Sequence, residues 1–323
     1  MTTPKSSWSP AARFALRAGV FAAMTVVIGG FVTIALAAAT YFHPPLLVAG
    51  LGILNRKPMC ANMEVIRGAE THYLEEKYRA QLESSARLIQ KDPAGYNLWD
   101  TPRGRWWIPN GSDKYLVAIL AQQQSKIYGS GSSGVQAGDV VLDCGAHIGI
   151  YSREALDSGA KLVIAIEPAP ANLECLRRNM SGEIAAGRVI VYAKGVWDKE
   201  DTLVLNEDPK NSAADSFVMK PENNVAEKRI QLTTIDRLVS ELSISKVGMI
   251  KMDIKGATER ALTGGKQTLA ASKPRLAIST EETADNAKEI ASFVEHMGLG
   301  YRVECGTCSM SEFMVHPDVL LFR

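Results

Sequence analysis

The chain of 323 residues carries 36 Lys and Arg against 35 Asp and Glu, a formal net charge of +1, and 46% of its residues are hydrophobic. A chain of this length can bury a substantial core and corresponds to about two structural units. The balanced charge provides no field that would attract nucleic acid, so we expect no nucleic-acid partner. Five cysteines are too few, and odd in number, for the disulfide framework of a small secreted domain.

Residues 18–42 form an uncharged run of 25 residues after a short tail over residues 1–17. At the helical rise the run is about 38 Å long, enough to cross a hydrocarbon core of about 30 Å. We therefore predict a single transmembrane helix. A cleaved signal peptide is the alternative, because Arg13 and Arg17 precede the run and the residues ALAAAT resemble a cleavage site. The length and the aromatic end of the run favour an uncleaved anchor.

The orientation of this helix in the membrane depends on the positive charges at its two ends. Basic residues flank the helix on both sides, namely Lys5, Arg13 and Arg17 before it and Arg56, Lys57 and Arg67 after it. The positive-inside rule therefore gives only a small bias toward a cytoplasmic N-terminus. We expect a single-pass protein of a bacterial-type inner membrane, with membrane lipids among its partners, and the side of its large domain stays open.

Residues 43–137 are expected to connect the membrane to a folded domain. Residues 63–90 alternate apolar and charged positions in the manner of a long amphipathic helix. The stretch YNLWDTPRGRWWIP places a Pro and Gly turn between aromatic runs, which predicts a hairpin. A further helix is expected over 114–128, and GSGSSG is typical of a flexible linker.

From residue 138 to the C-terminus, apolar runs typical of strands alternate with helical stretches. The strand-like runs are DVVLDCG, KLVIAIEP, RVIVYAKGVW, KVGMIKMDI and PRLAIST, followed by YRVEC and VLLFR. This alternation predicts a doubly wound α/β domain with a mostly parallel, seven-stranded, Rossmann-like sheet and a C-terminal antiparallel hairpin.

The run VVLDCGAHIGIYS is a buried strand that enters a glycine turn and then a helix, which is an arrangement that receives a nucleotide. Gly145 and Gly149 have the spacing Gly-x-x-x-Gly, which does not match the Gly-x-Gly-x-x-Gly pattern of dinucleotide enzymes. Glu167 ends the next strand, 22 residues after Gly145, where a carboxylate accepts hydrogen bonds from ribose hydroxyls.

Six segments resemble FkbM-family methyltransferases in their order along residues 138–279: VVLDCGAHIGIYS, VIAIEPAPANLECLRRNM, GVWDKEDTLVL, TTIDRL, MIKMDIKGATERAL and KPRLAIS. The resemblance implies a fold that binds S-adenosylmethionine (SAM). The residues that it assigns to this cofactor are Asp143, Gly145, Ala146 and Gly149 at the methionine end, Glu167 and Asn172 at the ribose, and Trp197 and Asp198 beside the adenine.

The chain departs from this family at the acceptor side. The family pattern Asp-x-Glu-Gly-Ala-Glu is represented here by Asp253, Ile254, Lys255, Gly256, Ala257 and Thr258, so both glutamates are missing. Asp253 is the best remaining general base for a hydroxyl acceptor. His147 is a second catalytic candidate, although a histidine in a tight turn is more commonly only hydrogen-bonded. Lys251 and Lys255 either bind an anionic acceptor or lie solvated, and we expect the latter.

Cys305 and Cys308 form a single C-x-x-C motif, which is too little for a zinc site unless His296 or His316 joins. We predict no metal and expect a structural loop, or a disulfide within the pair if the domain is extracytoplasmic. Cys144 and Cys175 are expected to be small buried hydrophobic side chains.

Two functions compete at this point. The first is a membrane-anchored O-methyltransferase that acts on a sugar, a lipid-linked molecule or another small hydroxylated acceptor. The second is a catalytically impaired, methyltransferase-like accessory subunit of a larger membrane-protein complex, for example a respiratory or photosynthetic one. The altered acidic pattern favours the second function, whereas the intact cofactor pattern favours the first.

Overall fold

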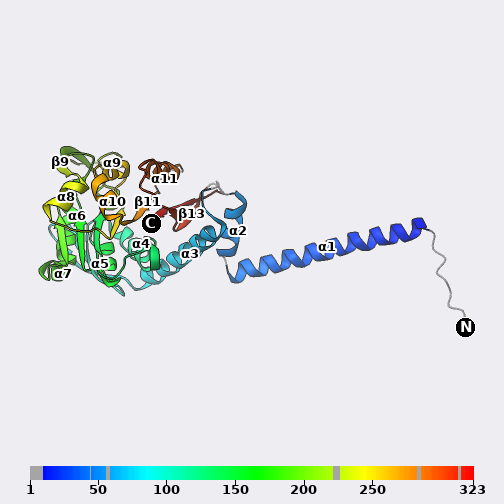
Figure 1. Cartoon of the computed structure of the whole chain (residues 1–323). Helices are drawn as coiled ribbons and strands as arrows, with labels where there is room; N and C mark the ends of the chain where they lie inside the picture. The colour runs from blue at the N-terminus through cyan, green and yellow to red at the C-terminus, as the bar shows by residue number, and fades with distance from the viewer. Residues whose placement is uncertain (1–9, 44, 56–58, 221–225, 282–284, 312–313) are drawn as a thin grey trace, which may run out of the picture.

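The computed structural model describes residues 10–43, 45–55, 59–220, 226–281, 285–311 and 314–323. A long helix extends away from a rounded α/β body (Figure 1). The N-terminal half consists of α1 (Pro10–Phe42), α2 (Pro45–Asn55), α3 (Asn62–Ser85), β1 (Arg87–Asp92), β2 (Tyr96–Thr101), β3 (Gly104–Pro109) and α4 (Asp113–Gln124). A 3-10 helix (Gly131–Ser133) leads from there into the α/β body.

The α/β body begins with β4 (Val140–Cys144) and ends with β15 (Val319–Phe322). Between them lie α5 (Ile150–Asp157), β5 (Leu162–Ile166), α6 (Pro170–Asn179), α7 (Ser181–Ala185), β6 (Val189–Tyr192), β7 (Gly195–Val196), β8 (Asp201–Glu207), a 3-10 helix (Ser212–Ala214), β9 (Ala226–Thr233) and α8 (Ile235–Glu241). The remaining elements are β10 (Met249–Met252), α9 (Thr258–Thr263), α10 (Lys266–Ser272), β11 (Arg275–Ser279), α11 (Asn286–His296), β12 (Val303–Cys305), β13 (Cys308–Ser311) and β14 (Met314–Pro317).

The central sheet has seven strands in the order β12-β15-β11-β10-β4-β5-β6. Strands β4, β5, β6, β10 and β11 pair in parallel, whereas β15 is antiparallel to both of its neighbours. The predicted doubly wound α/β fold with a C-terminal antiparallel hairpin is therefore confirmed. All five residues of β4 are buried, as expected for a parallel strand that is covered on both faces.

Alternate residues of the central strands belong to two different cores, because successive side chains of a strand point to opposite faces. Val140, Leu142 and Cys144 of β4 join the core beneath α8, α9, α10 and α11, whereas Val141 joins the core beneath α5 and α6. This two-sided burial holds the carboxyl ends of β4, β5, β10 and β11 together at one edge of the sheet, where α/β folds place their ligands.

The N-terminal elements differ in part from the sequence-based expectation. The long amphipathic helix ends at Ser85 rather than continuing to residue 90, because the chain enters β1, which pairs with β2 to extend the expected hairpin into a three-stranded sheet. α4 ends at Gln124, four residues before the predicted end, and Lys126 then takes a left-handed φ of 60°. α4 packs on α3 and α5, so this segment is part of the folded body.

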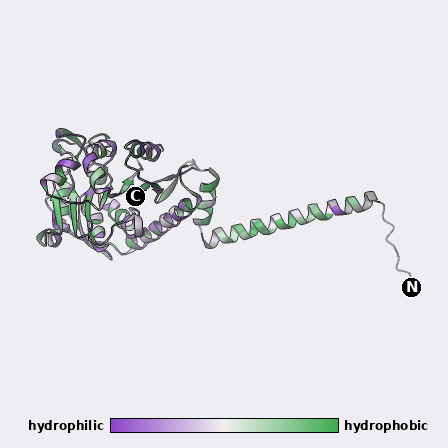
Figure 2. Cartoon of the chain, in the orientation of Figure 1, coloured by the Kyte–Doolittle hydropathy of each residue, from purple (hydrophilic) through white to green (hydrophobic). Residues whose placement is uncertain are grey.

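Helix α1 contains a 21-residue stretch, Gly19–Ala39, with a mean hydropathy of 2.3 and none of it buried within the protein. Its apolar character contrasts with the mixed hydropathy of the residues in the body (Figure 2). By length and composition it can span a membrane, and a signal sequence near an N-terminus has the same properties. Of the basic residues that bear on orientation, Lys5, Arg56 and Lys57 lie outside the described residues, as do the first nine residues of the predicted tail.

The predicted alternative of a disulfide between Cys305 and Cys308 was wrong. Cys305 of β12 forms a disulfide with Cys60, which precedes α3, across a sequence separation of 245 residues. Cys308 remains a buried free thiol, as do Cys144 and Cys175. The C-x-x-C motif therefore does not act as a pair, because tertiary packing brings a distant cysteine next to Cys305.

Candidate cofactor and acceptor site

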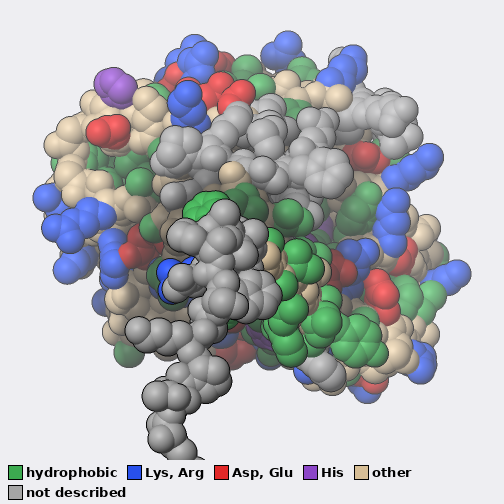
Figure 3. All heavy atoms as spheres, turned by 90° about the vertical axis from the view of Figure 1, so that its right-hand side faces the viewer, with side chains coloured by type: hydrophobic (Ala, Val, Ile, Leu, Met, Phe, Trp, Pro, Cys, Tyr) green, Lys and Arg blue, Asp and Glu red, His purple; other side chains and the backbone are tan. Residues whose placement is uncertain are grey.

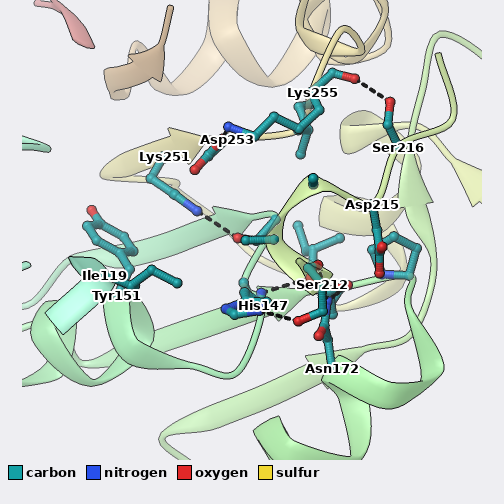
Figure 4. Close-up of a pocket in the computed structure, with 18 of the residues that line it drawn as sticks. Ile119, His147, Tyr151, Asn172, Ser212, Asp215, Ser216, Lys251, Asp253 and Lys255 are labelled. Atoms are coloured by element: carbon teal, nitrogen blue, oxygen red, sulfur yellow. Dashed lines mark hydrogen bonds and ion pairs between the residues drawn. The ribbon is translucent and has the colours of Figure 1, made fainter. Parts of the chain in front are cut away.

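A cavity of about 260 Å³ lies at the carboxyl ends of β4, β5 and β10. Its lining includes Gly145, Ala146, His147, Glu167, Asn172 and Asp253 from the predicted site. Side chains from α4, Tyr128 and the segment 211–217 close the cavity on its other sides. Figure 4 shows His147, Ser212 and Asn172 grouped at one end and Lys251, Asp253 and Lys255 at the other. Six of the predicted residues therefore line one continuous cavity, and its two ends differ in chemistry.

The turn after β4 is held rigidly by the neighbouring strand ends. The N–H groups of Gly145 and Ala146 both donate to the carbonyl oxygen of Ile166, each over 3.0 Å. Gly145 has a φ of 81°, and a Cβ atom at this position would overlap the carbonyl oxygen of Asp253. Glycine is required here both by the left-handed backbone and by this close approach.

Asp143 lies beneath the turn and does not line the cavity. Its carboxylate is fully buried, accepts a 2.7 Å hydrogen bond from the Ser152 hydroxyl and lies 3.1 Å from the Nζ atom of Lys251. Lys251 also donates to the carbonyl oxygen of Gly145 over 2.7 Å. The expectation that Lys251 is solvated was wrong: it is only 4% exposed, because it neutralises a buried carboxylate that supports the turn.

Glu167 presents a buried carboxylate to the cavity. Its Oε2 atom accepts a 2.8 Å hydrogen bond from the N–H of His147, and Oε1 accepts from the N–H of Ala169 and from Asn172 over 2.9 and 3.4 Å. A carboxylate offers about four acceptor positions, so one remains on Oε2 for a ligand hydroxyl. Burial raises the pKa of Glu167 to about 7, although these hydrogen bonds and Lys251 oppose the rise.

The segment around Ser212 crosses the cavity beside Glu167, a contact that the sequence did not predict. The Ser212 N–H donates to the Ser112 hydroxyl over 2.9 Å, and its carbonyl accepts from the Asn172 amide over 3.0 Å. Its hydroxyl lies 2.9 Å from Nε2 of His147. Asp215 follows, and burial first, then the nearby charge of Glu167, raises its pKa to about 8. The run NSAADS signals only a loop, so no local pattern could place it here.

His147, the second catalytic candidate, has a left-handed backbone with a φ of 50°. Burial, together with the charge of Lys251, lowers its pKa to about 4 even though Asp253 opposes the shift. The side chain is therefore uncharged near neutral pH. Its Nδ1 atom is buried and has no hydrogen-bond partner among the described residues.

Asp253, the first catalytic candidate, is engaged by two other side chains. Its Oδ1 atom lies 2.7 Å from Nζ of Lys255, and Oδ2 accepts a 3.1 Å hydrogen bond from the Tyr128 hydroxyl. Burial raises the pKa of Asp253, but the charges of Lys255 and Lys251 and these hydrogen bonds outweigh burial and hold the pKa well below its usual range. Lys255 is therefore paired with Asp253, contrary to the expectation that it lies solvated.

The remaining predicted residues lie just outside the cavity. Gly149 is at the N-terminus of α5, where a Cβ atom would collide with Leu176. Trp197 packs in a small core with Leu232, and Asp198 accepts a 2.6 Å hydrogen bond from Arg260. Gly195 and Val196, which directly precede them, do line the cavity. A contact of Trp197 or Asp198 with a cofactor stays a prediction.

Substituting Gly145 by alanine is expected to lower the free energy of unfolding by about 2–5 kcal/mol, because the left-handed backbone costs about 1–2 kcal/mol and the overlap with Asp253 about 1–3 kcal/mol more. Gly138→Ala is the matched control, since Gly138 has a φ of 85° but open space around a Cβ atom. Chemical unfolding of the two variants in detergent measures the difference. Equal losses would show that the close approach at Gly145 is unimportant.

The family profile described as Methyltransferase FkbM domain matches residues 143–303. No protein of curated function matches the chain. Among solved structures, the chain is similar to an FkbM methyltransferase from Methylobacillus flagellatus KT, with 16% identity over 80% of this chain and 61% of that chain and a TM-score of 0.44. This chain therefore spans about three fifths of that protein's length.

Two other similar structures are also described as methyltransferases or bind a methyltransferase cofactor. Precorrin-6y C5,15-methyltransferase from Geobacter metallireducens GS-15 is 18% identical over 63% of this chain and 85% of that chain, with a TM-score of 0.36. TYW2 from M. jannaschii in complex with AdoMet is 13% identical over 73% and 85%, with a TM-score of 0.36. Through the domain matched over residues 143–303, this chain belongs to the FkbM methyltransferase family.

Proposed function

We propose that this protein is a SAM-dependent O-methyltransferase, tethered to a membrane by α1, that acts on a sugar, a lipid-linked molecule or another small hydroxylated acceptor. The observation that supports this most directly is the cavity at the strand ends, where Glu167 accepts a hydrogen bond from the glycine turn of an FkbM domain and keeps one acceptor position open. SAM supplies an activated methyl group on a sulfonium ion, which a positioned nucleophile can accept.

The polar atoms of the cavity fit such a cofactor. Nδ1 of His147, Oδ1 of Asn172, Oδ1 of Asn211 and the Tyr151 hydroxyl are buried without a hydrogen-bond partner among the described residues. Buried polar groups are normally satisfied, so unsatisfied atoms that line one cavity indicate a polar ligand. Glu167 and Asp215 add two carboxyls whose pKa values are raised by burial, and a cationic ligand would stabilise their charged forms.

The other end of the cavity fits a hydroxylated acceptor. Asp253 and the Tyr128 hydroxyl lie there, together with Glu281 at the exposed rim, beyond the end of β11. Transfer to a hydroxyl requires alignment of that hydroxyl and removal of its proton. In our proposal Asp253 accepts the hydroxyl hydrogen bond and takes this proton.

Titration of the full chain in detergent with SAM tests the cofactor assignment. Glu167→Gln should weaken binding by about 1.5–3 kcal/mol, since it removes a charge-assisted hydrogen bond. Glu174→Gln on α6 is the control, because Glu174 is absent from the cavity lining and pairs with Arg178 instead. SAM binding should strengthen as pH rises through about 7, where Glu167 ionises to the accepting form, and the Gln variant should lose this part of the pH dependence. Equal SAM affinity in the two variants would exclude Glu167 from the site.

A second candidate is an impaired methyltransferase domain that serves as an accessory subunit of a larger membrane-protein complex. The Asp253–Lys255 ion pair favours it. Asp253 is the one carboxylate left in the acidic sequence pattern, and its charge is neutralised by Lys255, which replaces a family glutamate. Purification of the chain from its native membrane under mild conditions separates the candidates. A stoichiometric complex without SAM binding supports the accessory role, and an isolated chain that binds SAM supports the enzyme.

A further inference from the structure

Helix α2 carries an apolar face that nothing in the described part of the chain covers. Its sequence, PLLVAGLGILN, contains no charged residue. Leu46, Leu47 and Leu54 are exposed, and Leu54 exposes 81% of its surface. These positions share one side of the helix, whereas Pro45 and Ala49 are buried on the side that packs against α3 and β14. Exposed leucines grouped in this way usually mark a contact surface.

The position of α2 in the chain identifies what this face contacts. α2 begins at Pro45, directly after the apolar helix α1 ends at Phe42. Side chains with polar aromatic rings lie at the junction: Tyr41 exposes 81% of its surface, and the His43 ring contacts the Tyr73 ring at 6.3 Å between centroids. Tyrosine is typical of the boundary between lipid and water. Figure 3 views the molecule from the side on which α1 extends and shows hydrophobic side chains grouped around the line along which α1 projects toward the viewer.

α2 is also packed against the body and cross-linked to it, so it is not a free connecting segment. Ile53 of α2 and Met59 pack against the main hydrophobic core of the α/β domain. The disulfide from Cys60 to Cys305 joins the turn after α2 to the central sheet. A surface that contacts α2 therefore also determines the orientation of the catalytic domain.

We propose that α2 lies in the lipid–water interface of the membrane that α1 crosses, with Leu46, Leu47 and Leu54 inserted among the acyl chains. Eleven residues are too short to span a bilayer, and an uncharged helix with one buried and one exposed apolar face is suited to lie along its surface. The proposal does not depend on cofactor binding or on catalysis.

This docking determines the distance between the bilayer and the cavity. Glu75 of α3 interacts with Gln122, which lines the cavity. From Asn62, at the α2 end, to Glu75, α3 covers about 20 Å at the helical rise of ~1.5 Å per residue. The cavity wall at Gln122 therefore lies about 20 Å from the start of α3, measured along the helix.

The test uses the full chain reconstituted in phosphatidylcholine and phosphatidylglycerol nanodiscs, with an environment-sensitive fluorophore attached at Leu54→Cys. The native cysteines are buried or disulfide-bonded, so the added thiol is the reactive one. Ile89→Cys on β1 is the control, because Ile89 is an exposed apolar residue away from α2. We expect quenchers on lipid chains to act several times more strongly on the label at position 54, and aqueous iodide several times more strongly on the label at position 89.

Equal iodide quenching at positions 54 and 89 would overturn the proposal. It would also be overturned if the label at position 54 were shielded in native membranes but open to iodide in nanodiscs, because a protein partner would then cover α2. Leu47→Cys repeats the measurement on the same face and guards against a local disturbance at position 54.

Discussion

Replacing both Cys60 and Cys305 by alanine is expected to lower the free energy of unfolding by about 2–5 kcal/mol. The disulfide closes a loop of nearly the whole folded body, and it holds the start of α3 against β12 at one edge of the central sheet. Without this link the unfolded chain gains entropy, and α2 and α3 lose a covalent attachment to the sheet. Chemical unfolding in detergent, with and without reductant, measures the effect.

Cys308→Ala is the matched control, since Cys308 is a buried free thiol beside Gly68 of α3. It removes a sulfur from the same region without removing a cross-link, and should cost about 1 kcal/mol. Reductant should destabilise the parent protein and leave the double variant unchanged. Equal stability of the parent and the double variant would contradict the role of the disulfide.

The same bond reports on the side of the membrane that holds the domain. Disulfides persist in oxidising compartments and are rare in the cytoplasm. Alkylation of the denatured chain, taken directly from cells, should modify the three free cysteines if the bond forms there, and all five if it does not. An oxidised pair would place the domain outside the cytoplasm, away from the normal supply of SAM, and would favour the accessory role. A reduced pair would favour the enzyme.

Substituting Lys255 by glutamine is expected to increase methyl transfer by up to about 100-fold, because it removes the cation that suppresses the basicity of Asp253. Burial alone would raise the pKa of Asp253, and the charge of Lys255 is the largest opposing influence. Without it the pKa should rise toward the working pH, which makes Asp253 a stronger general base. Initial rates with radiolabelled SAM and a membrane lipid and saccharide extract, measured across pH, test this result.

Lys246→Gln is the control, because Lys246 is exposed before β10, at the opposite end of that strand from Asp253. Asp253→Asn should abolish the transfer while leaving SAM affinity nearly unchanged. Restoring the second family glutamate at Thr258 is less informative, since Thr258 is buried and a new carboxylate there would lack a partner. An unchanged rate in Lys255→Gln would show that Asp253 is not the base.

The sequence alone was sufficient to predict the sheet, the glycine turn and the carboxylate after β5. These features follow from local patterns: buried apolar runs bounded by turn residues specify the strands, and the carboxyl ends of parallel strands meet at one edge. Gly145, Glu167 and Asp253 each follow a strand directly, so their meeting in one cavity could be anticipated.

The tertiary structure decided the contacts between residues far apart in the chain. Ser212 contacts Asn172 and His147, and Cys60 bonds to Cys305. No local pattern of apolar and polar residues specifies these long-range contacts. Lys251 and Lys255 look like solvated lysines in the sequence, yet each pairs with a carboxylate. Strand geometry places Lys251 beside the buried Asp143, and the turn after β10 brings Lys255 back to Asp253. Charge state and reactivity depend on such neighbours, and therefore only the folded chain determined how strongly Asp253 can act as a base.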